Sequence, residues 1–312
     1  MMRGRGLAGT SFGDRGHTME NVEGKVAFIT GGASGIGLGI ARAFVNAGMK
    51  AAIADIRTDA LRDANAKFVE DGQGDRVVTL QLDVTDRGAM GRAADATEQA
   101  FGKVHVLVNN AGIGIGGPVR DAKYADWDWG LEVNLGGVIN GIQEFLPRMI
   151  AHGEGGHIIN TSSMAAVVPM RVASIYITAK AAVLGLSEEL RGELEPDNIG
   201  VSAFCPGPVR TNISRSGELR PEKYRANSGY AEVEQKLKER PNSPSWMDPD
   251  EVGERVLAGL RRNDLFIFTH REFKEGLAQR CRKMLESFPD EEINTARYED
   301  IKWLTENAIY RD

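Results

Sequence analysis

The chain has 312 residues, is 42% hydrophobic and 26% charged, and carries a formal net charge of −6. This composition is typical of a globular protein large enough to fold without disulfides or a structural metal, and its two distant cysteines and scattered histidines offer no disulfide framework and no metal-ligand spacing. The acidic balance argues against nucleic-acid partners, and no apolar run reaches the ~20 residues that cross a membrane, so we expect a cytoplasmic protein with neither kind of partner.

The chain opens on residues 1–22, which are rich in Gly and Arg and are predicted to be a disordered or non-native leader. From Lys25 onward, short β-branched runs alternate with stretches of helical periodicity. The predicted strands are Val26–Thr30, Ala51–Asp55, Val77–Asp83, Val104–Asn109, His157–Thr161, Val201–Cys205 and Leu265–Thr269. The predicted helices are Gly35–Ala47, Thr58–Asp71, Arg87–Phe101, Asp126–His152, Ile175–Leu194 and Asp250–Arg261.

This alternation predicts an α/β fold, with a doubly wound, parallel, seven-stranded sheet of the Rossmann-like kind. We expect a single catalytic domain over residues 23–271. A polar, proline-containing segment at residues 210–246 breaks the alternation and is predicted to be a lid insertion. Residues 272–312, which begin with helical spacing at Phe273, Leu277 and Cys281, are predicted to be a C-terminal helical extension.

The first strand is followed by a glycine-rich turn, Thr30-Gly31-Gly32-Ala33-Ser34-Gly35-Ile36-Gly37, which opens the first helix. Glycine allows a sharp turn and a close approach to a pyrophosphate, and the helix N-terminus offers amide donors to the anion. Glycine also serves plain structural turns. Here the strand before it, the helix after it and an acidic residue about twenty positions further on favour dinucleotide binding.

The acidic residue is Asp55, at the end of the second strand. Its carboxylate can accept hydrogen bonds from the ribose hydroxyls of NAD, whereas the 2′-phosphate of NADP would bring a like charge to the same place. NAD is therefore the favoured cofactor and NADP is less favoured, although the nearby Arg57 could receive a phosphate. Asp83, at the end of the third strand, is expected either to reach the adenine or to cap the following helix.

A second group of polar residues is predicted at the carboxyl edge of the sheet. Tyr176 and Lys180 stand four positions apart, so both project from one face of a helix. Ser163 ends the strand before that helix, and Asn134 lies in the helix before that strand. Each residue alone fits an ordinary structural role, but ligands of doubly wound proteins bind at this edge of the sheet.

These motifs resemble the compact branch of the short-chain dehydrogenase/reductase family. The resemblance rests on the TGxxxGxG turn, Asn109-Asn110-Ala111-Gly112, Asn134, Ser163, Tyr176-Ile-Thr-Ala-Lys180 and Pro206-Gly207-Pro-Val-Arg-Thr211. It implies that Asn134, Ser163, Tyr176 and Lys180 form a catalytic tetrad and that Asn109 steadies the sheet. It also implies NAD rather than NADP, because Ser34 and Ile56 stand where members that prefer NADP usually carry a basic residue.

The cofactor contacts expected from the turn, the strand ends and the resemblance are Gly31, Ser34, Gly35, Ile36, Gly37, Asp55, Asp83, Val84, Asn110, Ala111, Gly112, Tyr176, Lys180, Pro206, Gly207, Val209 and Thr211. No metal ligands are expected. In the implied reaction Tyr176 exchanges a proton with a secondary alcohol or its ketone, and Lys180 is expected to lower the tyrosine pKa. Ser163 is expected to donate to the substrate oxygen, and Asn134 to bind a water linked to Lys180.

The substrate is expected to be an apolar or aromatic secondary alcohol or ketone, because two segments predicted to face Tyr176, Ile113–Gly117 and Met164–Met170, are mostly apolar. The lid, residues 210–246, is expected to face the same site. The sequences of the lid and of residues 265–270 are similar to those of bacterial Cα-dehydrogenases of lignin-derived aryl ethers.

The resemblance further implies a homodimer or homotetramer built on the helices around Gly136–Met149 and Ala179–Leu194. Two alternatives to an alcohol dehydrogenase remain open from the sequence. One is an NAD-binding redox sensor or scaffold without turnover, since one fold hosts unrelated functions. The other is an epimerase or dehydratase, which shares the Tyr–Lys pair but usually has a different glycine spacing and a larger C-terminal domain.

Overall fold

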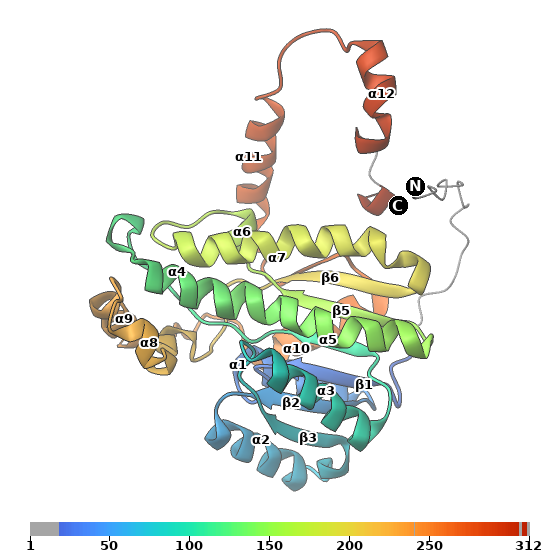
Figure 1. Cartoon of the computed structure of the whole chain (residues 1–312), viewed down its shortest axis with the longest axis vertical. Coiled ribbons are helices and arrows are strands. Elements are labelled where there is room, and N and C mark those ends of the chain that lie inside the picture. Colours follow the sequence, from blue (N-terminus) through green and yellow to red (C-terminus); the bar gives the residue numbers. More distant parts are fainter. Residues whose placement is uncertain (1–18, 240, 306–307, 311–312) are drawn as a thin grey trace.

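The computed structural model describes residues 19–239, 241–305 and 308–310. Figure 1 shows a central sheet between two layers of helices. The sheet is all parallel, with seven strands in the order β3-β2-β1-β4-β5-β6-β7. The strands are β1 Val26–Thr30, β2 Lys50–Asp55, β3 Val77–Gln81, β4 Val106–Asn109, β5 Gly156–Thr161, β6 Ile199–Cys205 and β7 Phe266–Phe268. The predicted fold class and all seven strands are confirmed, with end shifts of one or two residues.

The strands lie inside because they are continuous apolar runs rather than alternating ones, as expected of a parallel sheet that is covered on both faces. Every residue of β1 and of β6 is buried. The register of the first crossover places Ile29 beside Ile53 on one side and Val108 on the other. Aliphatic side chains of the central strands therefore meet at the same level of the sheet.

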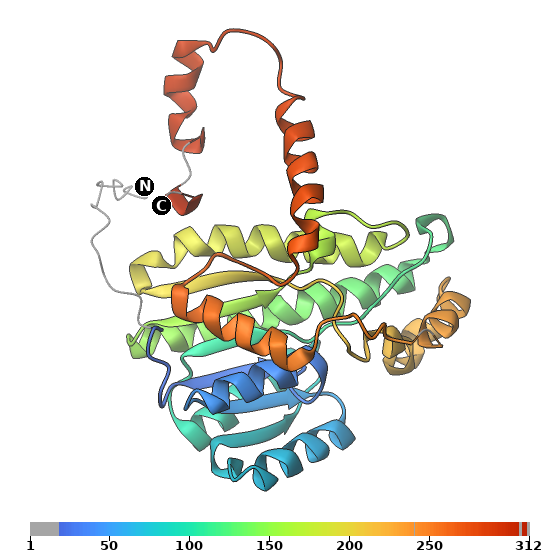
Figure 2. The same cartoon turned by 180° about the vertical axis from the view of Figure 1, so that it is seen from behind.

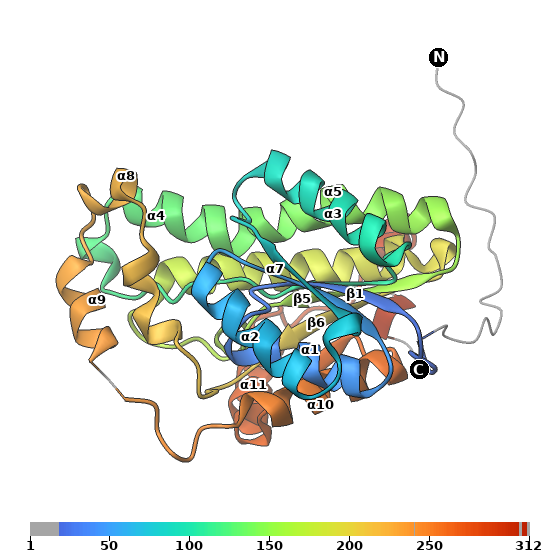
Figure 3. The same cartoon turned by 90° about the horizontal axis from the view of Figure 1, so that it is seen from below.

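Helices cover both faces of this sheet, as the view in Figure 3 shows. One face is covered by α1 Gly35–Asn46, α2 Thr58–Glu70 and α10 Pro249–Arg262, whose apolar residues share one core cluster. The other face is covered by α3 Arg87–Phe101, α5 Gly137–His152 and α7 Ser174–Glu193, which share a second cluster. These are the two layers of a doubly wound domain.

The remaining elements are shorter. They are α4 Tyr124–Leu131, α6 Met164–Val167, α8 Glu222–Arg225, α9 Ala231–Lys238, α11 Lys274–Leu285 and α12 Thr295–Thr305, with η1 Gly74–Arg76, η2 Val119–Asp121, η3 Glu132–Gly136, η4 Glu195–Asp197, η5 Ile213–Leu219, η6 Arg271–Phe273 and η7 Ala308–Tyr310. The lid, residues 210–246, contains η5, α8 and α9 and lies between β6 and α10 in the sequence.

The prediction of one unbroken helix over Asp126–His152 is wrong. The structure has α4, then the π-helical turn η3, then α5. A π turn holds one more residue than an α turn, and a periodicity of 3.6 residues in the sequence does not register a single extra position. The turn contains Asn134, whose side chain is buried.

The boundaries of the domain also differ from expectation at the N-terminal end. The predicted leader over residues 1–22 lies outside the described residues except for its last four. Of these, Met19 and Val22 are buried and belong to the core cluster of α1 and α10. The described domain therefore begins at Met19 rather than at residue 23.

The C-terminal extension forms a helical hairpin. In Figures 1 and 2, α11 and α12 project from the body of the domain, and the chain then returns to it. The return is fixed by Tyr310, whose ring stacks on Phe266 at 6.5 Å and whose hydroxyl donates to Glu188 at 2.6 Å. Across residues 19–239, 241–305 and 308–310, no helix is both long and apolar enough for a membrane span, and no group of acidic, His or Cys side chains could hold a metal ion.

Candidate active site

The glycine turn is held tightly between α1 and the end of β4. A Cβ atom on Gly37 would lie 2.1 Å from the carbonyl oxygen of Gly31, so only glycine lets α1 start this close to the turn. Asn110, directly after β4, donates from Nδ2 to the carbonyl oxygens of Thr30 at 3.0 Å and Gly31 at 3.3 Å. Gly35 has a φ of +52° and faces the side chain of Thr211.

A cavity of about 530 Å³ lies at this edge of the sheet. Its floor follows the carboxyl ends of the strands, the place where doubly wound proteins bind nucleotides. The predicted cofactor residues that line it are Gly31, Ser34, Gly35, Ile36, Asp55, Asp83, Val84, Asn110, Ala111, Gly112 and Thr211. Residues from five separate segments of the sequence are thus brought to one wall.

The Asp55 carboxylate is one of the acidic groups that line this cavity. Oδ1 accepts from the backbone N–H of Arg57 at 3.0 Å, and Oδ2 accepts from that of Ala33 at 3.3 Å. Burial raises the pKa of Asp55, while these two backbone donors oppose the rise. Each oxygen keeps a lone pair for a further donor. A glycine-walled cavity that ends in such an acceptor pair fits an adenosine with free ribose hydroxyls.

Asp83 also lines the cavity, but its side chain is engaged in its own turn. Oδ1 accepts from both the backbone N–H of Thr85 at 2.9 Å and its hydroxyl at 2.8 Å. The cap of α3 is Asp86, which accepts from Ala89 at 2.9 Å. Of the two roles expected for Asp83, helix capping is therefore wrong.

The predicted tetrad lies on the other side of Gly112. A Cβ atom on Gly112 would lie 2.9 Å from Oδ1 of Asn134 and 3.4 Å from Nζ of Lys180. Since Gly112 itself lines the cavity, the glycine turn and the tetrad share one short piece of backbone. Lys180 is buried and donates from Nζ to the carbonyl oxygen of Thr161 at 2.8 Å.

Burial has the largest effect on the titration of this group. It lowers the pKa of Lys180 to about 8. It raises the pKa of Tyr176, and a hydrogen bond from Ser163 opposes that rise. Lys180 Nζ lies 5.7 Å from the centre of the Tyr176 ring. Desolvation of the phenol therefore raises the Tyr176 pKa when the protein groups act alone. The lowering by Lys180 together with oxidised nicotinamide stays a prediction.

The side-chain amide of Asn134 is held by Ile113, and the expected water next to it stays a prediction. Its Oδ1 accepts from the backbone N–H of Ile113 at 3.0 Å, and its Nδ2 donates to the carbonyl oxygen of the same residue at 3.1 Å. Both ends of the side-chain amide are therefore used within the protein. The π turn aims this residue at the segment that carries Gly112, so Asn134 holds the cavity floor beside Lys180.

Several predicted residues lie close to the cavity without lining it: Gly37, Tyr176, Lys180, Pro206, Gly207 and Val209. Pro206 accepts from the backbone N–H of Met164 at 3.0 Å, and Gly207 donates to the Thr269 hydroxyl at 3.0 Å. Val209 belongs to the apolar core. The segment 206–209 thus anchors the start of the lid, while Thr211 reaches the cavity.

Asn109, expected to steady the sheet, links β4 to β5. Its Nδ2 donates to Asn160 at 2.9 Å, and Asn160 in turn donates to the hydroxyl of Ser187 in α7 at 3.1 Å. All three side chains are buried. This chain of hydrogen bonds ties α7 to β4 and β5.

The outer part of the cavity was only partly foreseen. Its apolar wall is made by Ile113, Trp129, Val133, Ile213 and Leu219, and its polar wall by Glu132, Arg215, Glu218, Lys223 and Tyr224. The lid faces the cavity as expected. The segment Met164–Met170 does not line it, because Met164 and Val167 pack with Cys205 and with Leu277 of α11. The sequence signals for this wall were the polar lid and the apolar segment Ile113–Gly117.

Comparisons with known proteins agree with this geometry. A model of the short chain dehydrogenase family matches residues 25–221. The chain is 40% identical over 271 residues to a C alpha-dehydrogenase of Sphingobium sp. (strain NBRC 103272 / SYK-6), covering 86% of this chain and 88% of that one.

Two solved structures are similar along nearly their whole length. One is a short chain dehydrogenase/reductase from Burkholderia phymatum in complex with NAD, with 31% identity, a TM-score of 0.80 and coverage of 88% and 99% of the two chains. The other is the apo form of LigO from Sphingobium sp. strain SYK-6, with 38% identity, a TM-score of 0.73 and coverage of 91% and 97%.

Proposed function

We propose that this chain transfers hydride between NAD and an apolar or aromatic secondary alcohol or the matching ketone. The proposal starts from the family, because the chain belongs to the short-chain dehydrogenase family. The chain is an NAD(P)-dependent oxidoreductase of that family. The choice of NAD over NADP, the substrate class and the roles of individual residues are the proposal.

One observation carries it: Gly112 lines the cavity and also lies against Asn134 and Lys180. A dinucleotide that runs from Asp55 along the glycine turn would end beside Gly112, next to the Tyr176 helix. An alcohol held at the Tyr176 hydroxyl would then lie close to the reactive end of the cofactor.

In this proposal Tyr176 is the acid and base of the reaction. Its hydroxyl takes the proton of the substrate alcohol in oxidation and returns it in reduction. Ser163, which already bonds to Tyr176, donates to the substrate oxygen and orients it. When bound, oxidised NAD supplies the hydride acceptor and a positive charge that favours tyrosinate. Asn134 acts as a positioning residue through its two bonds to Ile113.

The preference for NAD is supported by the surroundings of Asp55. Both of its carboxylate oxygens can accept a ribose hydroxyl, and a 2′-phosphate at the same place would meet a carboxylate. Arg57 and Asp59 line the cavity beside it. Since Arg57 is matched there by two acidic side chains, the charge around this end of the cavity does not favour a phosphate.

The substrate class is supported by Trp129, Ile113 and Leu219 in the outer wall and by the similarity to the C alpha-dehydrogenase. We propose a secondary alcohol next to an aromatic ring, of the kind found in lignin-derived aryl ethers. An apolar wall with a single polar reaction corner suits such a molecule.

The test is a turnover assay with NAD and a panel of alcohols. We expect NADH absorbance to rise with 1-phenylethanol and with an aryl ether that carries a benzylic secondary alcohol, and to rise less with short aliphatic alcohols. Silence across the panel with intact NAD binding would instead favour a redox sensor or scaffold. Water loss or inversion at carbon without net NADH formation would favour a dehydratase or an epimerase.

We also propose that the protein is a homodimer or homotetramer. Helices α5 and α7 are the first candidates, and the hairpin of α11 and α12 adds a second surface. Phe288 and Trp303 are 74% and 77% exposed on it, and Ile293 and Leu304 are exposed as well. The first helix of the hairpin is mainly basic and residues 286–300 are mainly acidic, so two hairpins in an antiparallel pair would match opposite charges.

A further inference from the structure

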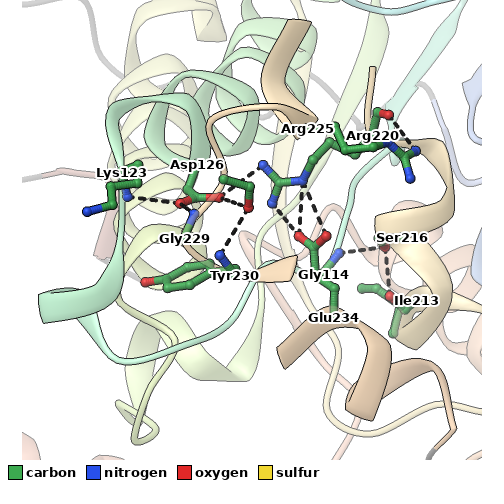
Figure 4. A network of polar contacts seen from close by, with 11 residues as sticks. Gly114, Lys123, Asp126, Ile213, Ser216, Arg220, Arg225, Gly229, Tyr230 and Glu234 are labelled. Atoms are coloured by element: carbon green, nitrogen blue, oxygen red, sulfur yellow. Dashed lines mark hydrogen bonds and ion pairs between the residues drawn. The ribbon is translucent and has the colours of Figure 1, made fainter. Parts of the chain in front are cut away.

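The lid contains an arginine that is buried almost completely. The side chain of Arg220, between η5 and α8, is 1% exposed, and its partner Asp126 in α4 is 0% exposed. Nη1 of Arg220 lies 3.0 Å from Oδ1 of Asp126, as an ion pair outside hydrogen-bond geometry. The other edge of the guanidinium, Nε and Nη2, donates to Glu234 of α9, with 3.1 Å between Nε and Oε1. Figure 4 shows this arrangement.

Asp126 collects further donors from the lid and from α4. Its carboxylate accepts from the hydroxyl of Ser228 at 2.6 Å, from the N–H of Gly229 at 2.9 Å and from the N–H of Lys123 at 2.9 Å. One buried carboxylate therefore joins the start of α4 to two points of the lid. Arg220 is its countercharge.

The same guanidinium lies over the ring of Trp129, 4.2 Å from its centre. Trp129 lines the outer cavity and packs with Ile175, the residue directly before the catalytic tyrosine. Tyr176 itself packs against this cluster. A continuous line of contacts thus runs from the buried arginine through the cavity wall to the proposed acid and base.

Two other contacts fix the lid to the same wall. The hydroxyl of Ser216 accepts from the N–H of Gly114 at 2.8 Å, and the hydroxyl of Tyr230 donates to the carbonyl oxygen of Gly117 at 3.2 Å. Both land on the segment that follows Gly112. The lid is therefore attached to the cavity wall at several points. Among the residues labelled in Figure 4, Arg220 is the only cation that is fully buried.

A role in stability alone explains this network poorly. Two charges taken out of water lose their hydration, so apolar side chains of the same volume would often stabilise a core equally well. An arginine can, however, reach two carboxylates in fixed directions, which defines the position of the elements that carry them. Of the two carboxylates here, one belongs to α4, outside the lid, and the other to α9, within it.

We propose that Arg220 is a positioning residue, which fixes the lid and the Trp129 wall and so determines which alcohols reach Tyr176. This inference rests on the proposed function for its substrate. Four residues of the lid are contact points of this network: Ser216, Arg220, Ser228 and Tyr230.

The first test compares Arg220→Lys with Arg262→Lys as the matched control. Lysine keeps the charge but lacks the planar fork that reaches two carboxylates in fixed directions. Arg262 forms an exposed pair with Asp264 outside the lid. We expect Arg220→Lys to raise KM for 1-phenylethanol and the benzylic aryl ether by roughly 10-fold, with kcat and the Kd for NAD within about twofold of wild type. The control is expected to match wild type in all three quantities.

The second readout needs no turnover. The lid carries several Arg and Lys residues, so limited trypsin digestion reports how firmly it is attached. We expect Arg220→Lys to speed cleavage within residues 210–246 by roughly 10-fold. Glu234→Gln removes the charge of the carboxylate at the other end of the network. It is expected to shift cleavage and KM in the same direction, and it replaces Arg220→Lys as the test variant if Arg220→Lys does not fold.

The outcomes separate the two proposals. If the wild-type protein oxidises none of the alcohols, the proposed function fails while digestion still measures the attachment of the lid. Unchanged cleavage and unchanged KM in both variants would overturn the positioning role. Loss of NAD affinity in step with KM would overturn it too, because the effect would then be on the whole domain.

Discussion

Lys180 donates a hydrogen bond of 2.8 Å to the carbonyl oxygen of Thr161. The bond joins the catalytic helix α7 to the carboxyl end of β5, next to Ser162 and Ser163. It also places an ammonium group where water does not reach it, and burial there lowers the lysine pKa to about 8. The position that serves the reaction is therefore one that the fold holds at a cost in stability.

The first prediction concerns this cost. A fall in pKa from 10.5 to about 8 corresponds to about 3 kcal/mol, and the lost bond to Thr161 offsets about 1 kcal/mol. We expect Lys180→Met to raise the free energy of unfolding by about 2 kcal/mol at pH 7 and to abolish turnover. Urea denaturation at pH 7 measures the change, and a less stable variant would contradict the burial of a charged lysine.

The same pKa predicts how stability depends on pH. Between pH 8 and 10.5 the unfolded chain keeps a proton on Lys180 that the folded chain has lost, so the stability of the wild-type protein rises with pH in this window. Lys180→Met removes that contribution. The free energies of unfolding of the two proteins are expected to differ less at pH 10 than at pH 7.5. An equal difference at both pH values would contradict the lowered pKa.

The second prediction separates chemistry from binding at Tyr176. Tyr176→Phe removes the hydroxyl and leaves the ring that packs on the Trp129 cluster. We expect turnover to fall by at least ~10²-fold, because the acid and base is lost. The Kd for NAD, measured by calorimetry, is expected to stay within about twofold of wild type. A parallel loss of NAD affinity would remove the role proposed here.

The third prediction concerns cofactor choice. Asp55→Ala removes both oxygens that face the proposed ribose, and we expect the Kd for NAD to rise by roughly 10-fold while the Kd for NADP rises less or falls. Asp63→Ala is the matched control, since Asp63 is an exposed residue of α2 that does not line the cavity. Equal weakening of both cofactors by Asp55→Ala would leave the preference for NAD without support.

The fourth prediction concerns the hairpin of α11 and α12. If two copies pair through it, Phe288→Asp combined with Trp303→Glu places charges in a buried interface and lowers the oligomeric state seen by light scattering. Val69→Glu, on the exposed side of α2, is the control and is expected to leave the state unchanged. An unchanged mass for the hairpin variant would assign self-association to α5 and α7 alone.

The fold could be predicted from the sequence because its elements carry strong local signals. The run Val26–Thr30 is apolar up to its last residue and is followed by the glycine turn, so it predicts strand, turn and helix at the positions where they lie. The seven strands needed only small corrections at their ends. Most predicted cofactor residues line one cavity, because the carboxyl ends of parallel strands meet at one edge.

What the sequence could not reveal depends on contacts between distant segments. Arg220 looked like one more charged residue of a polar lid, and nothing near it in the sequence indicates that it is buried against Asp126. Charged residues are seldom buried, so a sequence-based prediction assigns them to the surface. The effect of burial on the Tyr176 pKa is hidden for a similar reason, since a charge partner is visible in a sequence pattern and desolvation is not.

The π turn at Glu132–Gly136 has a consequence for how this region tolerates change. Deleting one residue there would let α4 and α5 merge into a single regular helix, and everything before the deletion would rotate by about 100° around the helix axis. Trp129 and Asp126 would then swing away from the substrate cavity and from their arginine partner. The extra residue sets the rotation of α4, which faces the lid, relative to α5, which packs on the sheet. The length of this turn is therefore constrained in addition to the identity of Asn134.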